Sequence, residues 1–182
     1  MVPWSADLDL ADFYLECSRR GFHNNSSESA LVDSILNFPR SQLWILYFNG
    51  VVAGSVGAHT LERFGPDAYR ICARTCVLTD RTPDKHLRNV RVGIREHQNI
   101  TAQFFIPTCI EWAGKDKHLF ITTHDSQEAS HRAVHRIYMP TLEDMGVAED
   151  FGEYEYRGQT QTFWKINVGE FYSQLALYPR WI

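Results

Sequence analysis

A run of cationic side chains immediately precedes an apolar segment in the middle of the chain. Residues 81 to 95 carry five cations against the single acid Asp84. The five are Arg81, Lys85, Arg88, Arg91 and Arg95. The segment that follows, ITAQFFIPTCIEWA at residues 100–113, is predicted to be a helix. Because a helix N-terminus presents unpaired N–H groups and the positive end of the helix dipole, this arrangement predicts a phosphate-bearing ligand. A solvated charged loop is the alternative for each individual cation.

The composition limits the classes of protein that the chain can represent. Its 182 residues, 44% of them hydrophobic, are enough to bury one core, and we expect a single domain over residues 1–182. The net charge of -4 argues against a nucleic-acid binder. The N-terminal MVPWSADLDLADF lacks a signal-peptide pattern, and no run approaches the roughly 18 apolar residues of a membrane span. We therefore expect a soluble, cytoplasmic protein with no membrane partner.

The cysteines predict neither a disulfide framework nor a metal centre. None of the four forms a CxxC pair. Cys72 and Cys76 would lie about 13 Å apart on one strand, at a rise of ~3.3 Å per residue, which is too far for a disulfide. Reduced, half-buried packing cysteines are favoured over a site in which Cys72, Cys76 and a histidine bind a metal, so we expect no metal.

The elements that must position these residues begin with two helices. Residues 6–20 form the first, with Ser5 as the N-cap and Gly21 as the terminator. Residues 27–38 form a shorter second helix that stops before Pro39.

Three antiparallel strands follow, and the first two form the most secure element of the chain. QLWILYF and VVAGSVGAHTL flank Asn49-Gly50, which is a strong signal for a β-hairpin. In the third strand, residues 68–79, polar and apolar positions alternate. The alternation places Arg70, Cys72, Arg74 and Cys76 on one face and Ile71, Ala73, Thr75 and Val77 on the other.

The second half of the chain alternates strand and helix. After the helix at 100–113, which Pro107 should kink, residues 118–124 form a buried strand. Asp125-Ser126-Gln127-Glu128 resembles a capping box and opens a helix that runs to Gly146, interrupted at Pro140. Residues 153–157 and 160–167 form a final strand pair.

This order of elements resembles the GNAT superfamily of N-acetyltransferases over roughly residues 5 to 167. LYFNGVVAGSVGAH looks like that family's second and third strands, IEWAGKDKHLFITT like its third helix and fifth strand, and LEDMGV like the end of its fourth helix. The resemblance implies an α+β fold, an αβα sandwich in which helices flank a mixed, mostly antiparallel sheet. An ordinary α+β domain with hairpins is the alternative.

The resemblance also implies a site for acetyl-CoA. The family binds the pyrophosphate in a loop before the third helix, usually Q/R-x-x-G-x-G/A. Counting back from IEWA places that loop at His97, Gln98, Asn99, Ile100, Thr101 and Ala102. Only Ala102 fits the pattern, since Ile100 occupies the usual glycine position; a second register over residues 90–95 keeps Gly93 but lies too far from the helix. Arg91 and Arg95 would add charge for the phosphates. The backbone of Val77, Leu78 and Thr79 would pair with the pantetheine arm.

The catalytic residues of the family are matched less well. Members often use a glutamate on the fourth strand and a tyrosine in the fourth helix, but residues 69–79 contain no glutamate and the tyrosine position holds Leu142 or, in another register, Ala133. Tyr138 lies one turn before Leu142 and could supply the acid if Pro140 bends the helix; a packing tyrosine is the alternative. His124, at the end of the fifth strand, is the candidate base, with a structural histidine as the alternative. His59 and Glu62 are weaker candidates.

Two functions follow from the resemblance. The first is an acyl-CoA-dependent N-acyltransferase, most simply one in which an unidentified amine attacks acetyl-CoA directly. The second is a non-catalytic GNAT-like domain that binds CoA or serves recognition. The aromatic residues Phe171, Tyr172, Tyr178 and Trp181 are expected to cover the chain's own core, with a homodimer contact as the alternative.

Overall fold

A mixed sheet forms the centre of the molecule. The computed structural model describes residues 1–82 and 100–177. Within these ranges, seven strands form one sheet in the order β1-β2-β3-β4-β5-β7-β6. Their bounds are β1 Val2–Pro3, β2 Ser41–Phe48, β3 Val51–Thr60, β4 Ala68–Val77, β5 His118–Thr123, β6 Ala148–Tyr156 and β7 Gln159–Ile166. Only β4 and β5 are parallel among these pairs, so the predicted mixed and mostly antiparallel sheet is confirmed.

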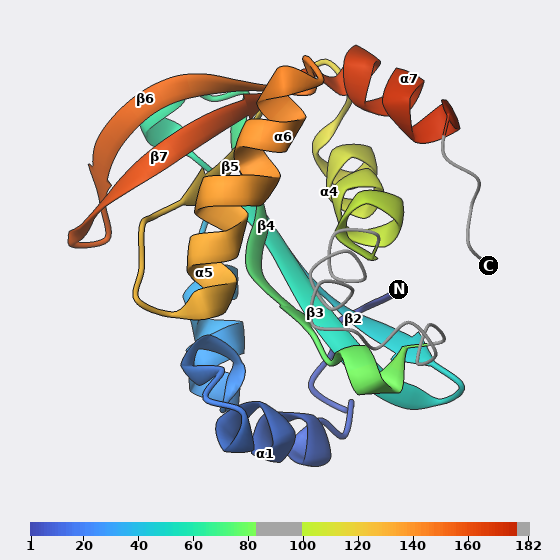
Figure 1. Cartoon of the computed structure of the whole chain (residues 1–182). Coiled ribbons are helices and arrows are strands. Elements are labelled where there is room, and N and C mark those ends of the chain that lie inside the picture. Colours follow the sequence, from blue (N-terminus) through green and yellow to red (C-terminus); the bar gives the residue numbers. More distant parts are fainter. Residues whose placement is uncertain (83–99, 178–182) are drawn as a thin grey trace.

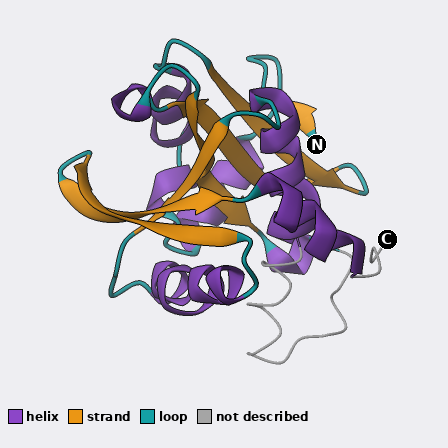
Figure 2. Cartoon of the chain, turned by 90° about the horizontal axis from the view of Figure 1, so that it is seen from above, coloured by secondary structure: helices purple, strands orange, loops and turns teal. Residues whose placement is uncertain are grey.

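Helices cover both faces of this sheet (Figures 1 and 2). One face carries α1 Ala11–Arg19 and α2 Ser34–Leu36, whose apolar side chains pack with Leu43, Ile45 and Ala73. The other face carries α4 Ile106–Ala113, α6 Met139–Asp144 and α7 Val168–Leu177, which pack with strand residues that include Val56, Ile71 and Trp164. The helix α5 Ala129–Ala133 leads into α6. The predicted αβα arrangement is therefore confirmed.

The hairpin between β2 and β3 follows the prediction closely. Asn49 and Gly50 have φ values of 51° and 76°, the left-handed conformation that a two-residue type I′ turn requires. Arg157 and Gly158 repeat this conformation, with φ values of 53° and 75°, between β6 and β7.

The first helix starts later than predicted. It begins at Ala11 rather than near Ala6, and Leu10, not Ser5, stands at its N-cap. The preceding chain makes other contacts: Val2 and Pro3 pair with β2, the Trp4 N–H donates to the Leu43 carbonyl at 2.8 Å, and the Leu8 N–H donates to the Ser5 carbonyl at 3.2 Å in a separate turn.

Two bulges interrupt β4, so the predicted strict alternation is wrong. Cys72 and Arg74 have φ values of 55° and 53°. The paired residues of the two strands are His59 with Arg70, Gly57 with Ala73 and Ser55 with Cys76. Between successive pairs in this list β3 advances by two residues and β4 by three, so β4 carries one extra residue each time. Each extra residue shifts the pleat, so that Ile71 and Ala73 enter the cores on opposite faces of the sheet. The buried Asn25 amide holds this conformation by donating to the Arg74 carbonyl and the Ser55 hydroxyl, both at 2.9 Å.

The two prolines within helices lie where the regular hydrogen-bond ladder is already broken. Pro107 follows the π-helical turn Thr101–Phe105, and Pro140 follows the π-helical turn Val134–Tyr138. A proline removes one N–H donor, and a widened turn accommodates that loss. The helix therefore continues through Pro140, and Tyr138 at the end of the widened turn is buried with 8% of its surface exposed.

The chain after residue 167 forms a helix that the sequence had not predicted. Phe171 in α7 is buried against the core, as expected for a residue that covers the chain's own sheet, and Tyr172 packs beside it. Tyr178 and Trp181 lie outside the described residues. No helix in the described ranges is both long enough and apolar enough to cross a membrane.

Candidate active site

The parallel strands β4 and β5 separate after three residue pairs. They pair at Ala68–His118, Tyr69–Leu119 and Arg70–Phe120, and no pair follows. Beyond this point β4 remains paired with β3 as far as Val77, and β5 remains paired with β7 as far as Thr123. The two strands thus leave a split between them that starts at Arg70 and Phe120, and both bulges of β4 lie along it.

The backbone near the end of β4 has donors and acceptors for a ligand in this split. The Leu78 N–H donates to the Ala53 carbonyl at 2.7 Å, toward β3. Because successive peptide groups of a strand point to opposite edges, the N–H and C=O of Val77 face the split. The side chains of Val77 and Leu78 are buried, and Thr79 begins the 3-10 turn Thr79–Arg81. The three residues predicted to pair with pantetheine thus follow directly on the bulged part of β4.

Tyr138 carries an unusual hydroxyl, and Cys72 on β4 acts on it electrostatically. This oxygen is buried and has no hydrogen-bond partner in the structure. Burial raises the pKa of Tyr138, and the nearby Cys72 adds to this shift, so that the phenol remains protonated well above neutral pH. A buried polar atom without a partner costs about 1–3 kcal/mol, which is a reason to expect that a ligand atom pairs with it.

Cys72, which lies on β4 along the split, is a poor nucleophile. The contact with the Cys109 thiol and the burial of both groups raise the pKa of Cys72. A thiol that stays protonated does not attack, and each of the four cysteines is free. On the other face of the sheet, Cys17 and Cys76 form a second thiol contact, with 3.8 Å between their Sγ atoms. In the described part of the chain, no group of three or more His, Cys, Asp or Glu side chains could hold a metal.

His124 lies directly after β5 in a surrounding of other imidazoles. Burial lowers the pKa of His124, and His131 and His135 lower it further. The rings of His124 and His131 have centroids 5.2 Å apart. Asp125 does not orient His124, because its carboxylate accepts from Arg136 at 2.9 Å. A half-buried histidine that stays neutral at physiological pH has the protonation state that a general base needs.

Electrostatic interactions link Arg70 to His124 and, through Cys72, to Tyr138. The charge of Arg70 contributes to the pKa shifts of both His124 and Cys72, and Cys72 in turn influences Tyr138. His124 follows the last residue of β5, and Cys72 lies on β4 beyond its last pair with β5, so both residues border the split.

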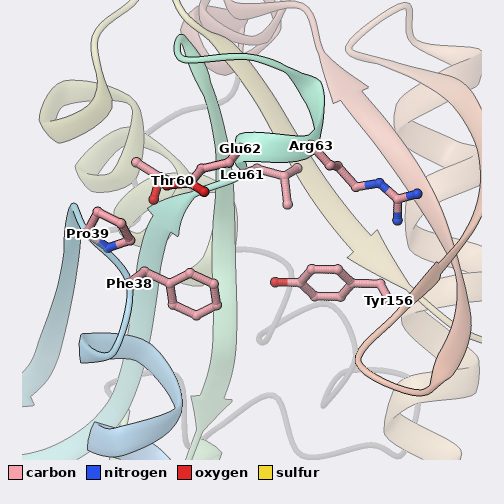
Figure 3. A pocket seen from close by; sticks show the side chains of 7 residues that line it. All are labelled: Phe38, Pro39, Thr60, Leu61, Glu62, Arg63 and Tyr156. Carbon is pink, nitrogen blue, oxygen red and sulfur yellow. The ribbon is translucent and has the colours of Figure 1, made fainter.

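His59 and Glu62 lie on the face of the sheet that carries α1. His59 is fully buried and stacks on Phe38, with ring centroids 3.7 Å apart. Its Nδ1 donates to the Thr60 carbonyl at 2.7 Å, and burial lowers its pKa to about 3. A permanently neutral and enclosed imidazole is a structural residue. Glu62 instead lines a pocket of about 180 Å³ (Figure 3). The other lining residues are Phe38, Pro39, Thr60, Leu61, Arg63 and Tyr156.

Part of the predicted phosphate loop lies outside the described residues, namely Arg91, Arg95, His97, Gln98 and Asn99. Ile100 is among the described residues, and its packing accounts for the absence of glycine at this position of the loop. Its side chain is 7% exposed and belongs to the core beneath α4. Thr101 is also buried, whereas Ala102 is partly exposed. Ile100 thus serves packing, and a phosphate at this helix would have to bind through backbone N–H groups and the cations before it.

The sequence did not single out Arg157 and Tyr156 as site residues. Tyr156 ends β6 and Arg157 begins the turn to β7, yet the Arg157 guanidinium reaches the Ser34 carbonyl at 2.8 Å. No local pattern signals a contact between residues so distant in the chain.

Comparison with solved structures identifies relatives of this fold. Neither a family model nor a curated protein sequence matches the chain. Aminoglycoside 6'-acetyltransferase type Ii superposes with a TM-score of 0.55 at 10% identity, over 91% of this chain and 95% of its own. The aminoglycoside 6'-N-acetyltransferase from Enterococcus faecium gives 0.51 at 13% identity, with the same coverage of 91% and 95%. FeeM, an N-acyl amino acid synthase from uncultured soil microbes, gives 0.51 at 12% identity, over 97% and 96%.

Proposed function

Because the chain has the fold of the GNAT N-acetyltransferases, we propose that it is an acyl-CoA-dependent N-acyltransferase. The observation that carries this proposal is the split between β4 and β5, and the buried, unpartnered hydroxyl of Tyr138 adds to it. Acyl transfer to an amine needs a base, hydrogen-bond donors for the oxyanion and an acid for the leaving sulfur. The residues around the split offer candidates for the base and the acid.

Each residue has a definite role in the proposed reaction. The backbone of the segment from Val77 through Leu78 to Thr79 binds the pantetheine arm as an added strand would, chiefly through the N–H and C=O of Val77, because those of Leu78 pair with Ala53 and Arg81. The cations Arg91 and Arg95, together with residues 97–102, bind the phosphates. His124 accepts the proton of the attacking ammonium, and Tyr138 donates a proton toward the thiolate that leaves. Acetyl-CoA supplies the activated acyl group as a thioester.

The proposal has consequences for location and cofactors. The reaction needs acetyl-CoA and an amine but no metal ion. The four free cysteines, two of them in thiol contact at 3.8 Å, suit a reducing compartment, so we place the protein in the cytoplasm.

A non-catalytic CoA-binding or recognition domain is the second candidate. It is favoured by Leu142, which occupies the family's tyrosine position in one of the two registers and is buried in the core with 8% exposure. It is also favoured by the absence of a glutamate from β4. Turnover distinguishes the two candidates, since a recognition domain would bind CoA and release no thiol.

Calorimetric titration with acetyl-CoA tests the proposal. We expect the parent protein to bind and the Arg91→Ala/Arg95→Ala variant to bind at least about 10-fold more weakly, because each charge-assisted hydrogen bond contributes about 1.5–3 kcal/mol. Arg19→Ala/Lys115→Ala is the matched control, because it removes the same charge from two exposed side chains outside the site. No binding by the parent protein would refute the proposal. If acetyl-CoA binds but no amine causes release of the CoA thiol, the second candidate is favoured.

A further inference from the structure

Three arginines come together on the face of the sheet that carries α1 and α2. We call Arg70, Arg74 and Arg157 the arginine cluster. Arg70 and Arg74 belong to β4, and Arg157 belongs to the β6–β7 turn. Arg74 Nε donates to the Ser34 hydroxyl at 3.0 Å, and Arg157 donates to the carbonyl of the same serine at 2.8 Å. Arg70 and Arg157 both lie over the ring of Tyr156, with Cζ atoms 5.2 and 5.7 Å from its centroid.

The hydrogen-bond partners of this cluster are all neutral. Besides Ser34, Arg74 donates to the side-chain oxygen of Asn24. Among the residues that the structure describes, none of the three guanidiniums has a carboxylate within 4.0 Å. The Nε of Arg70 is buried and has no hydrogen-bond partner at all. At least one donor of the cluster is therefore shielded from water and free for a ligand.

The cations of the cluster also repel one another. Burial lowers the pKa of Arg70 to about 10, and the charges of Arg157 and Arg74 contribute to the shift. Burial and the charge of Arg157 likewise lower the pKa of Arg74. Half-buried like charges without a counterion are unfavourable unless an anion binds among them.

We propose that the arginine cluster binds an anionic group of the acceptor, so that the acceptor is a primary amine that also carries a carboxylate or a phosphate. This inference rests on the proposed acyltransferase function. Planar guanidiniums are well suited to both anions, because they offer paired N–H donors.

The position of the cluster agrees with an acceptor role. Arg70 is the last residue of β4 that pairs with β5, and Arg74 stands at the second bulge. An anion held here would lie beside the split, where the amine must meet the thioester. Phe38 and Tyr156, over which Arg157 lies at 5.0 and 5.7 Å, also line the pocket in Figure 3. That pocket can take an uncharged part of the acceptor.

Matched acceptor pairs test the proposal. Under saturating acetyl-CoA, thiol release is compared for L-amino acids against their amides and for O-phosphoethanolamine against ethanolamine, with spermidine as a polycationic amine. We expect the anionic member of at least one pair to have a kcat/KM at least about 10-fold higher than its neutral partner, and spermidine to be a poor acceptor. The first pair identifies a carboxylate and the second a phosphate. Equal rates for anionic and neutral members would overturn the inference and leave the acyltransferase function intact.

Because Arg157 is exposed, its substitution tests the proposal without disturbing the packing of the core. Arg157→Gln should raise KM for the anionic acceptor about 10-fold without changing KM for acetyl-CoA, and Arg157→Lys should restore part of this loss because it keeps the charge. Arg19→Gln, an exposed arginine on α1, should change neither constant. Unchanged KM for the acceptor in Arg157→Gln would contradict the proposal.

A binding experiment separates this inference from the failure of the proposed function. Inorganic phosphate is titrated into the protein and followed by NMR shifts or calorimetry, without acetyl-CoA. Saturable binding that Arg157→Gln weakens would support the anion site even if acetyl-CoA does not bind. If acetyl-CoA binds but neither phosphate nor any anionic amine does, the inference fails.

Discussion

Tyr138→Phe should stabilise the protein and inactivate it at the same time. The substitution removes one buried oxygen that has no hydrogen-bond partner, and it leaves the packed ring in place. An unsatisfied buried hydroxyl costs about 1–3 kcal/mol, so we expect the free energy of unfolding to rise by about 1–2 kcal/mol. For a chain of 182 residues this corresponds to an increase in Tm of roughly 2–8 °C.

The effect on turnover should have the opposite sign. If the Tyr138 hydroxyl donates a proton to the leaving sulfur, its loss should lower kcat about 10²- to 10⁴-fold. Binding of acetyl-CoA should stay within about threefold of the parent, because the predicted contacts of CoA are made by backbone groups and cations elsewhere. Urea unfolding, calorimetry and thiol release measure the three quantities on the same preparation.

Tyr69→Phe provides the matched control. Tyr69 is also buried, with 4% exposure, but its hydroxyl accepts a hydrogen bond from Arg40 at 2.6 Å. Its removal should destabilise the protein by about 1–3 kcal/mol and leave kcat unchanged. Our reasoning would be refuted if Tyr138→Phe lost stability as Tyr69→Phe does, since its hydroxyl would then have a partner, or if it kept full kcat.

Three further predictions concern protonation and packing. His124→Gln should lower kcat at least about 10²-fold and abolish the acid limb of the pH–rate profile; because the pKa of His124 is lowered, that limb should lie below pH 6.5 in the parent, and an unchanged profile in the variant would exclude His124 as the base. Lowering the pH should destabilise the fold through His59. The pKa of His59 is about 3 in the folded protein and about 6.5 in the unfolded chain, so the unfolded chain binds more protons at pH values between these two. The free energy of unfolding therefore falls as the pH drops from 6.5 toward 3. By pH 5 the loss is up to about 2 kcal/mol, which urea unfolding at pH 5 and 7 would detect as a slope that His59→Gln reduces. Gly54→Ala should cost about 1–3 kcal/mol or more, because its Cβ would lie 2.4 Å from the Cys76 carbonyl oxygen, whereas Gly169→Ala, which meets nothing closer than 3.6 Å, should be neutral or stabilising in urea unfolding.

Much of the fold could be read from local patterns. The Asn49-Gly50 hairpin formed as predicted because both residues tolerate positive φ, which is a property of the residues themselves. The strand predicted at 118–124 from its nearly continuous apolar run is present as β5 His118–Thr123, and helices run through Pro107 and Pro140 as predicted from local signals. The predicted bounds of an element were wrong where the backbone forms hydrogen bonds that its local sequence does not indicate. α1 starts at Ala11, after a segment in which Val2 and Pro3 pair with β2 and residues 5–8 form a turn.

The candidate site depended on the tertiary structure to a greater degree. The sequence identified His124 and Tyr138 by residue type and by resemblance, but it could not show that the Tyr138 hydroxyl is buried without a partner. It also could not predict the bulges at Cys72 and Arg74, because an alternating pattern contains no sign that β4 has two more residues than the β3 segment it pairs with. The Asn25 amide that supports the bulges lies 49 residues away from Arg74 in the chain.

The sequence by itself determined which side chains are present and which local elements they favour, because hydrophobic period and turn chemistry act over a few residues. Only the tertiary structure decided which charges meet. Arg157 contacts Ser34 across 123 residues of chain, and the arginine cluster exists only because a hairpin turn, a bulged strand and a short helix converge. Electrostatic interactions depend on distance in space, so a site built from such contacts has no signature along the chain.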